Sequence, residues 1–186
     1  MKKEIRILGI DDGPFERIPG KKTLIVGTFY RGGQFMDGLV SCKVTIDGDD
    51  ATEKIAKLAK TPKFYEQLHV IFIDGNCVAG FNVIDPYKLM ELTKKPVVFI
   101  LRDYPDYKKF WNAMRKAGKK KLINAVKKLP KPKKFKKIYY QAFGLKEHEA
   151  KGMITVSCTH SNIPEPIRVA HIIASGILTG VSTGKD

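Results

Sequence analysis

The chain has few cysteines, and their placement excludes two common ways of stabilising a small fold. Its 186 residues include only Cys42, Cys77 and Cys158, an odd number at wide spacing. A disulfide framework needs paired cysteines, and a structural zinc site needs closely spaced ones. We therefore interpret these three as buried or incidental thiols. The length predicts one domain, residues 1–186, with a core large enough to be stable by itself.

Long hydrophobic runs are also missing. No stretch approaches the roughly 20 apolar residues of a membrane span, and the N-terminus lacks the apolar segment of a secretory signal. The sequence thus predicts a cytoplasmic protein without a membrane partner. No pattern in it specifies an oligomeric state.

Acidic residues are absent from one long segment. Between residues 107 and 146 there are fifteen Lys or Arg and no Asp or Glu, while elsewhere nineteen basic residues balance nineteen acidic ones. The whole net charge of +15 therefore lies in this segment. Such a block indicates a polyanionic partner, most simply DNA, with RNA as the alternative. A second interpretation is the lysine-rich, solvated surface of a heat-adapted protein.

Short runs of β-branched and aromatic residues predict five strands, over residues 4–11, 23–30, 39–46, 68–73 and 97–101. Glycine-containing turns join the first three, which predicts an antiparallel meander. Helical spacing of apolar residues follows Asp50 and Thr52, the candidate N-caps, and Pro86 opens a second helix. This order of elements is that of a ribonuclease-H-like fold, an α/β mixed sheet of three antiparallel strands and then α-β-α-β, with flanking helices.

The C-terminal half is less regular. A basic helix over residues 110–126 is predicted to break near Gly118, and prolines forbid its continuation through the lysine run. Residues 138–143 and 153–158 are apolar and β-branched, which predicts strand or extended chain. A last helix is predicted over residues 164–180.

Acids follow three of the predicted strands. Asp11 and Asp12 end the first, Asp47, Asp49 and Asp50 follow the third, and Asp74 ends the fourth. In this topology the fourth strand lies parallel to the first, so the acids that end both meet at one edge of the sheet. Mg²⁺ prefers oxygen ligands, and paired ions assist phosphodiester cleavage. One Asp-Gly after a strand is an ordinary turn, but acids ending three core strands predict a metal site.

Basic side chains are predicted near the same edge. His171 lies on the apolar stripe of the last helix, which is typical of a core histidine; its alternative role is a proton shuttle or phosphate contact. Arg168, one turn earlier, pairs with an acid or holds a phosphate. Arg102, just past the fifth strand, is a phosphate contact or a surface charge. Within the basic block we predict nucleic-acid contacts by Lys119, Lys120 and Lys121.

Four motifs in this order resemble those of the archaeal endonuclease dU family, which is related to endonuclease V. They are Gly-Ile-Asp-Asp at residues 9–12, Asp-Gly-Asp-Asp-Ala-Thr at 47–52, Ala-Gly-Phe-Asn at 79–82 and Pro-Glu-Pro-Ile-Arg-Val-Ala-His at 164–171. They span nearly the full length, and the last is the most specific. The chain departs from endonuclease V near residues 36–40, where it lacks the Pro-Tyr-Ile-Pro wedge.

The resemblance implies a ribonuclease-H-like DNA repair endonuclease that nicks DNA near a deaminated base, deoxyuridine in particular, using Mg²⁺ with Mn²⁺ as its substitute. By position, Asp11, Asp47 and Asp74 match metal-binding catalytic acids, and His171 matches an active-site histidine of some endonuclease V proteins. Arg102 stands where endonuclease V has a lysine. Asp12 and Asp50 are additional acids. Two alternatives stay open: an endonuclease V-like nuclease for inosine-containing DNA or RNA, and a nucleic-acid-binding protein without catalysis.

Overall fold

A mixed β-sheet forms the centre of the molecule. The computed structural model describes residues 4–18 and 20–182. Within these ranges the sheet has seven strands in the order β3-β2-β1-β4-β7-β9-β8. Their bounds are β1 (Arg6–Asp12), β2 (Lys22–Arg31), β3 (Phe35–Thr45), β4 (Leu68–Asp74), β7 (Val97–Leu101), β8 (Lys133–Phe135) and β9 (Ile138–Phe143). A separate hairpin consists of β5 (Cys77–Val78) and β6 (Asn82–Val83).

The predicted strand pairing is confirmed. β1, β2 and β3 pair antiparallel, and β4 lies parallel to β1 on its other side, followed by parallel β7. The β1–β4 register pairs Ile10 with Ile73. Because the strands run in the same direction, the next residues, Asp11 and Asp74, lie on neighbouring strands at the same end of the sheet. The fold therefore brings two of the predicted acids to one edge.

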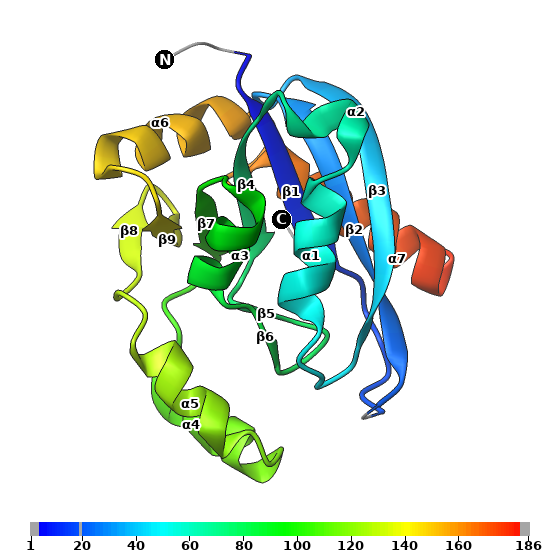
Figure 1. Ribbon diagram of the computed structural model, residues 1–186, viewed down its shortest axis with the longest axis vertical. Coiled ribbons are helices and arrows are strands. Elements are labelled where there is room, and N and C mark those ends of the chain that lie inside the picture. The colour runs from blue at the N-terminus through cyan, green and yellow to red at the C-terminus, as the bar shows by residue number, and fades with distance from the viewer. Residues whose placement is uncertain (1–3, 19, 183–186) are drawn as a thin grey trace.

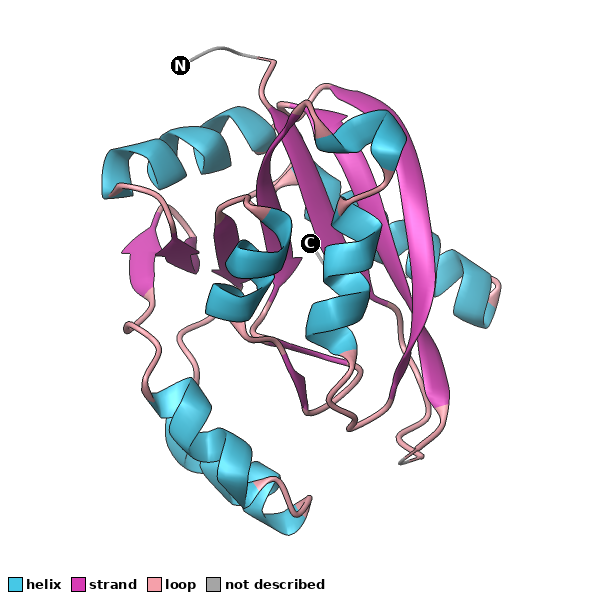
Figure 2. Cartoon of the chain, viewed as in Figure 1, coloured by secondary structure: helices cyan, strands magenta, loops and turns pink. Residues whose placement is uncertain are grey.

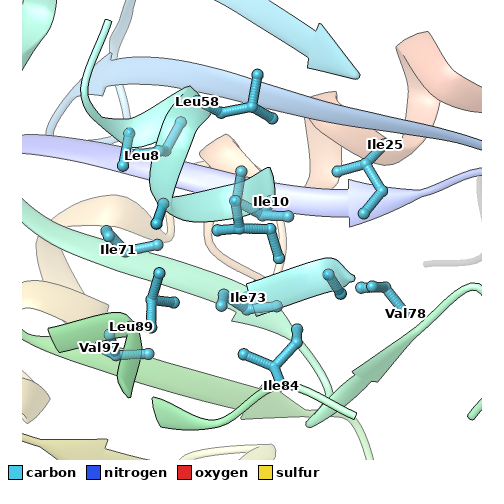
Figure 3. Close-up of a cluster of buried hydrophobic side chains, with 14 of the residues drawn as sticks. Leu8, Ile10, Ile25, Leu58, Ile71, Ile73, Val78, Ile84, Leu89 and Val97 are labelled. Carbon is cyan, nitrogen blue, oxygen red and sulfur yellow. The ribbon is translucent and has the colours of Figure 1, made fainter. Parts of the chain in front are cut away.

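Helices cover both faces of the sheet (Figures 1 and 2). Their bounds are α1 (Ala51–Ala59), α2 (Pro62–Tyr65), α3 (Pro86–Thr93), α4 (Tyr107–Lys116), α5 (Lys120–Lys127), α6 (Glu147–Ser157) and α7 (Glu165–Thr179). Leu8 and Ile10 of β1 pack toward α1 and α3 in the larger core, whose side chains Figure 3 shows. Ile7 points to the opposite face, where α6 and α7 add Ile154 and Ile167. This alternation is what a strand buried on both faces requires.

Gly9 allows α7 to approach β1 closely. A Cβ atom at this position would lie 2.3 Å from the carbonyl carbon of Pro166. Thr28 of β2 secures the same point, because its hydroxyl donates a hydrogen bond of 2.6 Å to the Pro166 carbonyl. The close packing places the later turns of α7, including His171, along the end of β1.

α4 and α5 extend from the sheet as a basic arm, residues 107–128 (Figure 1). Gly118, with φ of +73°, separates the two helices, which confirms the predicted break. A small cluster attaches the arm to the β5–β6 hairpin, where Phe81 packs with Met114 and Ile123 and contacts the Phe110 ring edge-on. This cluster packs the arm against the hairpin.

The prediction of extended chain at residues 153–158 is wrong, because residues 153–157 belong to α6. Glu149 accepts a hydrogen bond of 2.7 Å from the Lys146 N–H at the start of this helix. Ala150 and Ile154, four residues apart, are buried against the sheet. Burial of one helical stripe outweighs the modest preference of β-branched residues for strands. The short elements α2 and β8 were not predicted.

No helix within the described ranges is both long and apolar enough to cross a membrane.

Candidate active site

Three carboxylates gather at the carboxyl edge of β1 and β4. We call Asp11, Asp12 and Asp74 the acid cluster. Asp11 is buried, with 5% of its side chain exposed, and Asp74 shows 21%. The charge of Asp74 acts on Asp11 and raises the pKa of the Asp11 carboxyl. The predicted meeting of acids from the first and fourth strands is therefore seen in the structure.

Each acid of the cluster also contacts a different donor. Nδ1 of His171 lies 3.0 Å from Oδ2 of Asp11. The backbone N–H of Ala79, in the β5–β6 hairpin, donates to Asp12. The Arg102 guanidinium lies 3.7 Å from Asp74. One helix, one hairpin and one strand end thus each supply a group that faces the acids.

Burial raises the pKa values of these acids. It raises the pKa of Asp11 to about 7, with further repulsion from Asp74 and Asp12 and partial relief from His171. Burial likewise raises the pKa of Asp12 to about 6, opposed by the Ala79 N–H. The pKa of Asp74 is raised by burial, and Arg102 and His171 reduce the effect. The cluster therefore carries electrostatic repulsion that a bound cation would relieve.

His171 joins the acids through α7. Its hydrogen bond with Asp11 raises the pKa of the imidazole, and burial opposes this. On its other side, Nε2 lies 3.3 Å from the hydroxyl oxygen of Ser175, one helical turn later. The side chain is 29% exposed, so His171 is not an enclosed core residue. A histidine with both nitrogens in hydrogen bonds beside an acid can hold or move a proton at physiological pH. Ser175 was not predicted as a site residue, although its spacing of four residues from His171 indicates that both lie on one face of the helix.

The chemistry of the donor set suits a hard divalent cation, because every acid in the cluster offers oxygen. Within residues 4–18 and 20–182, however, no group of three or more His, Cys, Asp or Glu side chains converges closely enough to hold an ion. His171, the Ala79 N–H and Arg102 each engage one carboxylate of the cluster.

Asp47 lies outside the cluster. It follows β3 and adjoins the cluster through the β5–β6 hairpin, because its N–H donates to the Ala79 carbonyl at 2.8 Å and the Ala79 N–H donates to Asp12. Its carboxylate contacts Arg17 at 3.1 Å and accepts a hydrogen bond of 2.7 Å from the Phe81 N–H. A Cβ at Gly80 would lie 2.4 Å from its Oδ1. Burial raises the pKa of Asp47, but Arg17 and the Phe81 N–H outweigh this and hold it below the usual value. Its role as a metal ligand stays a prediction.

The contacts of Asp50 are those of a residue that stabilises the fold. It accepts hydrogen bonds from the Thr45 N–H at 3.0 Å and from the Asn82 amide at 2.7 Å, and Lys54 lies 2.7 Å away. Burial raises the pKa of this carboxyl, but Lys54 and the Thr45 N–H reverse the effect and keep it well below the usual value. These contacts join β3, α1 and the β5–β6 hairpin.

The other predicted basic residues lie in different places. Arg168 forms an ion pair of 2.7 Å with Glu165, which is 3% exposed, at the start of α7. Lys119 reaches from the basic arm to the Gly48 carbonyl at 3.3 Å, next to Asp47. Lys120 and Lys121 are exposed on the same arm. The arm thus touches the loop that carries Asp47 and presents further lysines to solvent.

An aromatic cavity opens beside Asp74. Its volume is about 540 Å³, and its lining includes Asp74, Arg102, Tyr104, Tyr107 and Phe110. The rings of Tyr104 and Tyr107 meet edge-on with centroids 6.0 Å apart. Sequence analysis missed these two tyrosines, although aromatic residues at 104, 107 and 110 directly follow the strand that ends near Arg102. Aromatic side chains stack on planar rings, so a cavity of this kind suits a ligand that contains a planar ring.

The strand order and the helices on both faces define the ribonuclease-H-like class of α/β folds, which includes nucleases. The chain belongs to the endonuclease dU family, whose model matches residues 3–178. It is 39% identical over 190 residues to a UPF0215 protein of Methanothermobacter thermautotrophicus, covering all of this chain and 93% of that one. It is 38% identical over 193 residues to a UPF0215 protein of Thermococcus sibiricus, covering 98% and 96%.

Solved structures agree with this fold. A protein of unknown function from Archaeoglobus fulgidus superposes with a TM-score of 0.86 at 35% identity, over 94% of this chain and 99% of that one. Human ENDOV gives a TM-score of 0.58 at 13% identity, over 92% and 83%. Ciona intestinalis Endonuclease V, solved with an inosine-containing 24mer DNA, gives 0.57 at 16%, over 90% and 83%. Family and fold together support a nuclease.

Proposed function

We propose that the protein is a metal-dependent DNA repair endonuclease that hydrolyses a phosphodiester bond near a deaminated base, in particular deoxyuridine. The observation that carries this proposal is the acid cluster at the end of β1 and β4, with His171 on one side and Arg102 on the other. Carboxylates with raised pKa values in such a setting are typical of functional sites rather than of scaffold.

In this proposal Asp11 and Asp74 hold Mg²⁺, or Mn²⁺ in its place, together with Asp12 and the more distant Asp47. A divalent cation at such a site activates water and neutralises charge that develops on the phosphate. His171 holds a proton at the ring nitrogens that face Asp11 and Ser175. Arg102, at the border between the acids and the aromatic cavity, orients a phosphate oxygen by charge-assisted hydrogen bonding.

The basic arm and the aromatic cavity support nucleic acid as the substrate. Lys119, Lys120 and Lys121 belong to a surface that attracts a phosphate backbone at low salt. The cavity lies directly beside Asp74, so a base displaced from its stack can lie against Tyr104 and Tyr107 while its phosphate lies at the acids. Deoxyuridine differs from thymidine only by lacking a methyl group. We therefore expect the shape of this cavity to determine which of the two bases it accepts.

The test is a nicking assay on end-labelled duplexes that carry one deoxyuridine, one deoxyinosine or no lesion. Each duplex is incubated with Mg²⁺, with Mn²⁺ and with EDTA. We expect a metal-dependent nick in the deoxyuridine duplex and no nick in EDTA. Binding of all duplexes without any metal-dependent nick would sink the catalytic proposal and favour a binding protein.

A nuclease for inosine-containing DNA or RNA is the second candidate. The observation that favours it is the shared fold with Ciona intestinalis Endonuclease V, whose structure contains an inosine-bearing DNA. The same assay separates the two, because preferential cutting of the deoxyinosine duplex, or of a matched RNA, would replace deoxyuridine as the substrate.

A further inference from the structure

A second cavity lies on the other side of Arg102. Its volume is about 610 Å³, and polar side chains line it, including Arg102, Lys137, His160, Ser161 and Asn162. Its apolar base comes from Ile138 and Ile163, both buried. We call it the polar cavity, to distinguish it from the aromatic cavity next to Asp74.

The charge in the polar cavity favours an anion. Arg102 and Lys137 supply two fixed positive charges, and Asp103 supplies one negative charge. In the part of the chain that the structure describes, no hydrogen bond or ion pair occupies the ammonium group of Lys137 or the side-chain amide of Asn162. Both groups are exposed and so can donate to a ligand without first breaking a contact in the protein.

The loop that forms one wall is held in place by its own hydrogen bonds. Thr159 donates to the Gly33 carbonyl at 2.9 Å, which ties the loop to the β2–β3 turn. The His160 N–H donates to buried Glu165 at 3.3 Å, and the Ser161 hydroxyl accepts from the Ile163 N–H at 3.0 Å. A wall fixed in this way loses little conformational entropy when a ligand binds.

The polar cavity adjoins the active site. Arg102 and Asp103 line both it and the aromatic cavity, and the latter includes Asp74. A nucleic-acid strand whose reacting phosphate lies at the acid cluster must leave the cluster past a neighbouring surface. On this side of Arg102 the neighbouring surface is lined by two positively charged side chains, Arg102 and Lys137, and by amide and hydroxyl groups. Such groups are ordinary partners of backbone phosphates.

We infer that the polar cavity is a subsite for a backbone phosphate of the cleaved strand, close to the nick, with Lys137 and Asn162 as its specific donors. The inference rests on the proposed function and extends it by assigning the path of the strand past Arg102. Such a contact fixes register, so it selects which phosphate lies at the acids rather than which base lies in the aromatic cavity.

The test combines protein variants with DNA duplexes in which a single phosphate is neutral. In EDTA, wild-type protein is titrated with deoxyuridine duplexes in which one phosphate at a time near the lesion is a neutral methylphosphonate. At the phosphate bound in the polar cavity we expect affinity to fall about 10-fold, the loss for one charge-assisted hydrogen bond. In Lys137→Gln, and separately in Asn162→Ala, that same substitution should have a much smaller effect, because the contact is already gone.

Lys134→Gln is the matched control. It removes the same charge from the same β8–β9 hairpin, at an exposed position outside the polar cavity, so it should keep the full methylphosphonate effect. Equal sensitivity at every phosphate in wild type and both cavity variants would overturn the inference while nicking shows the proposed function intact. Inorganic phosphate that binds wild type but not Lys137→Gln, together with no methylphosphonate effect at any position, would assign the cavity to a free anion and also overturn the inference. A wild type that neither binds nor nicks overturns both proposals.

Discussion

Two groups of aspartates lie toward the same edge of the sheet, and their environments shift their pKa values in opposite directions. Asp11 and Asp12, ending β1, have raised pKa values because burial and like charges disfavour ionisation. Asp47 and Asp50, following β3, have lowered pKa values, because Arg17, Lys54 and backbone N–H groups outweigh burial. The aspartates that end β1 therefore repel their neighbours, whereas those that follow β3 join segments of the fold.

The pairing of each carboxylate separates functional from structural acids at this edge. Carboxylates that are fully paired stabilise the folded chain and have little left to offer a ligand. Carboxylates left close together destabilise the chain until a cation or a proton joins them. Substitutions should consequently have opposite effects on stability in the two groups.

Asp74→Asn should reduce metal-dependent nicking by at least about 1,000-fold, the scale of losing a group that stabilises the transition state. The isosteric amide keeps the shape of the β4 terminus, so circular dichroism and DNA affinity should stay close to wild type. Asp49→Asn is the control, because this acid is exposed and lies two residues after Asp47 in sequence. Full activity in well-folded Asp74→Asn would remove Asp74 from the site.

Asp50→Ala should lower the free energy of unfolding by about 3 kcal/mol, since it leaves the Thr45 N–H and the Asn82 amide without their acceptor. Urea unfolding measures this. Asp49→Ala should change stability by less than about 0.5 kcal/mol, as expected for an exposed side chain. A loss of the same size in both variants would contradict the structural role assigned to Asp50.

Stability in EDTA should fall by about 2 kcal/mol as pH rises from about 5 to about 8. Folded Asp11 and Asp12 have pKa values of about 7 and about 6, above the ordinary 3.8, so folding favours their protonated forms. Their contribution is complete below the ordinary pKa and is lost as pH rises through the raised values. His171, whose pKa is also raised, acts in the same direction. Thermal unfolding across this range tests the sign, and stability rising with pH would contradict it.

Asp11→Asn should raise the free energy of unfolding at about pH 8 in EDTA by about 1 kcal/mol, because it removes one repelling charge from the cluster. Mg²⁺ should stabilise wild type and have little effect on this variant. Thermal unfolding with and without the ion gives both comparisons. Destabilisation by Asp11→Asn, or an equal response to Mg²⁺, would mean that the cluster does not store repulsion.

Lys121→Gln should weaken DNA binding about threefold at moderate salt and lower the slope of log affinity against log salt by about 1. Titrations at several salt concentrations measure this. Lys57→Gln removes the same charge from α1, an exposed position away from the basic arm, and should leave the slope unchanged. An unchanged slope in Lys121→Gln would exclude this lysine from the phosphate contacts.

Local sequence was sufficient for much of the fold. The apolar runs at β1, β4 and β7 have one physical outcome, burial on both faces, and Gly118 can end a helix because it readily adopts positive φ. The failure at residues 153–157 has an equally local cause. Ile, Thr and Val favour strands in isolation, but the helical spacing of Ala150 and Ile154 meets the sheet, and packing decides.

The candidate site divides in the same way. Acids at the ends of β1 and β4 and the position of His171 on one stripe of α7 follow from strand ends and helical period, which are local in the sequence. Folding in three dimensions turns His171 toward Asp11, pairs Asp47 with Arg17 and places Tyr104 and Tyr107 beside Asp74. Those contacts join residues far apart in the chain, and they depend on strand order and on the close approach of α7 at Gly9, neither of which a local pattern encodes.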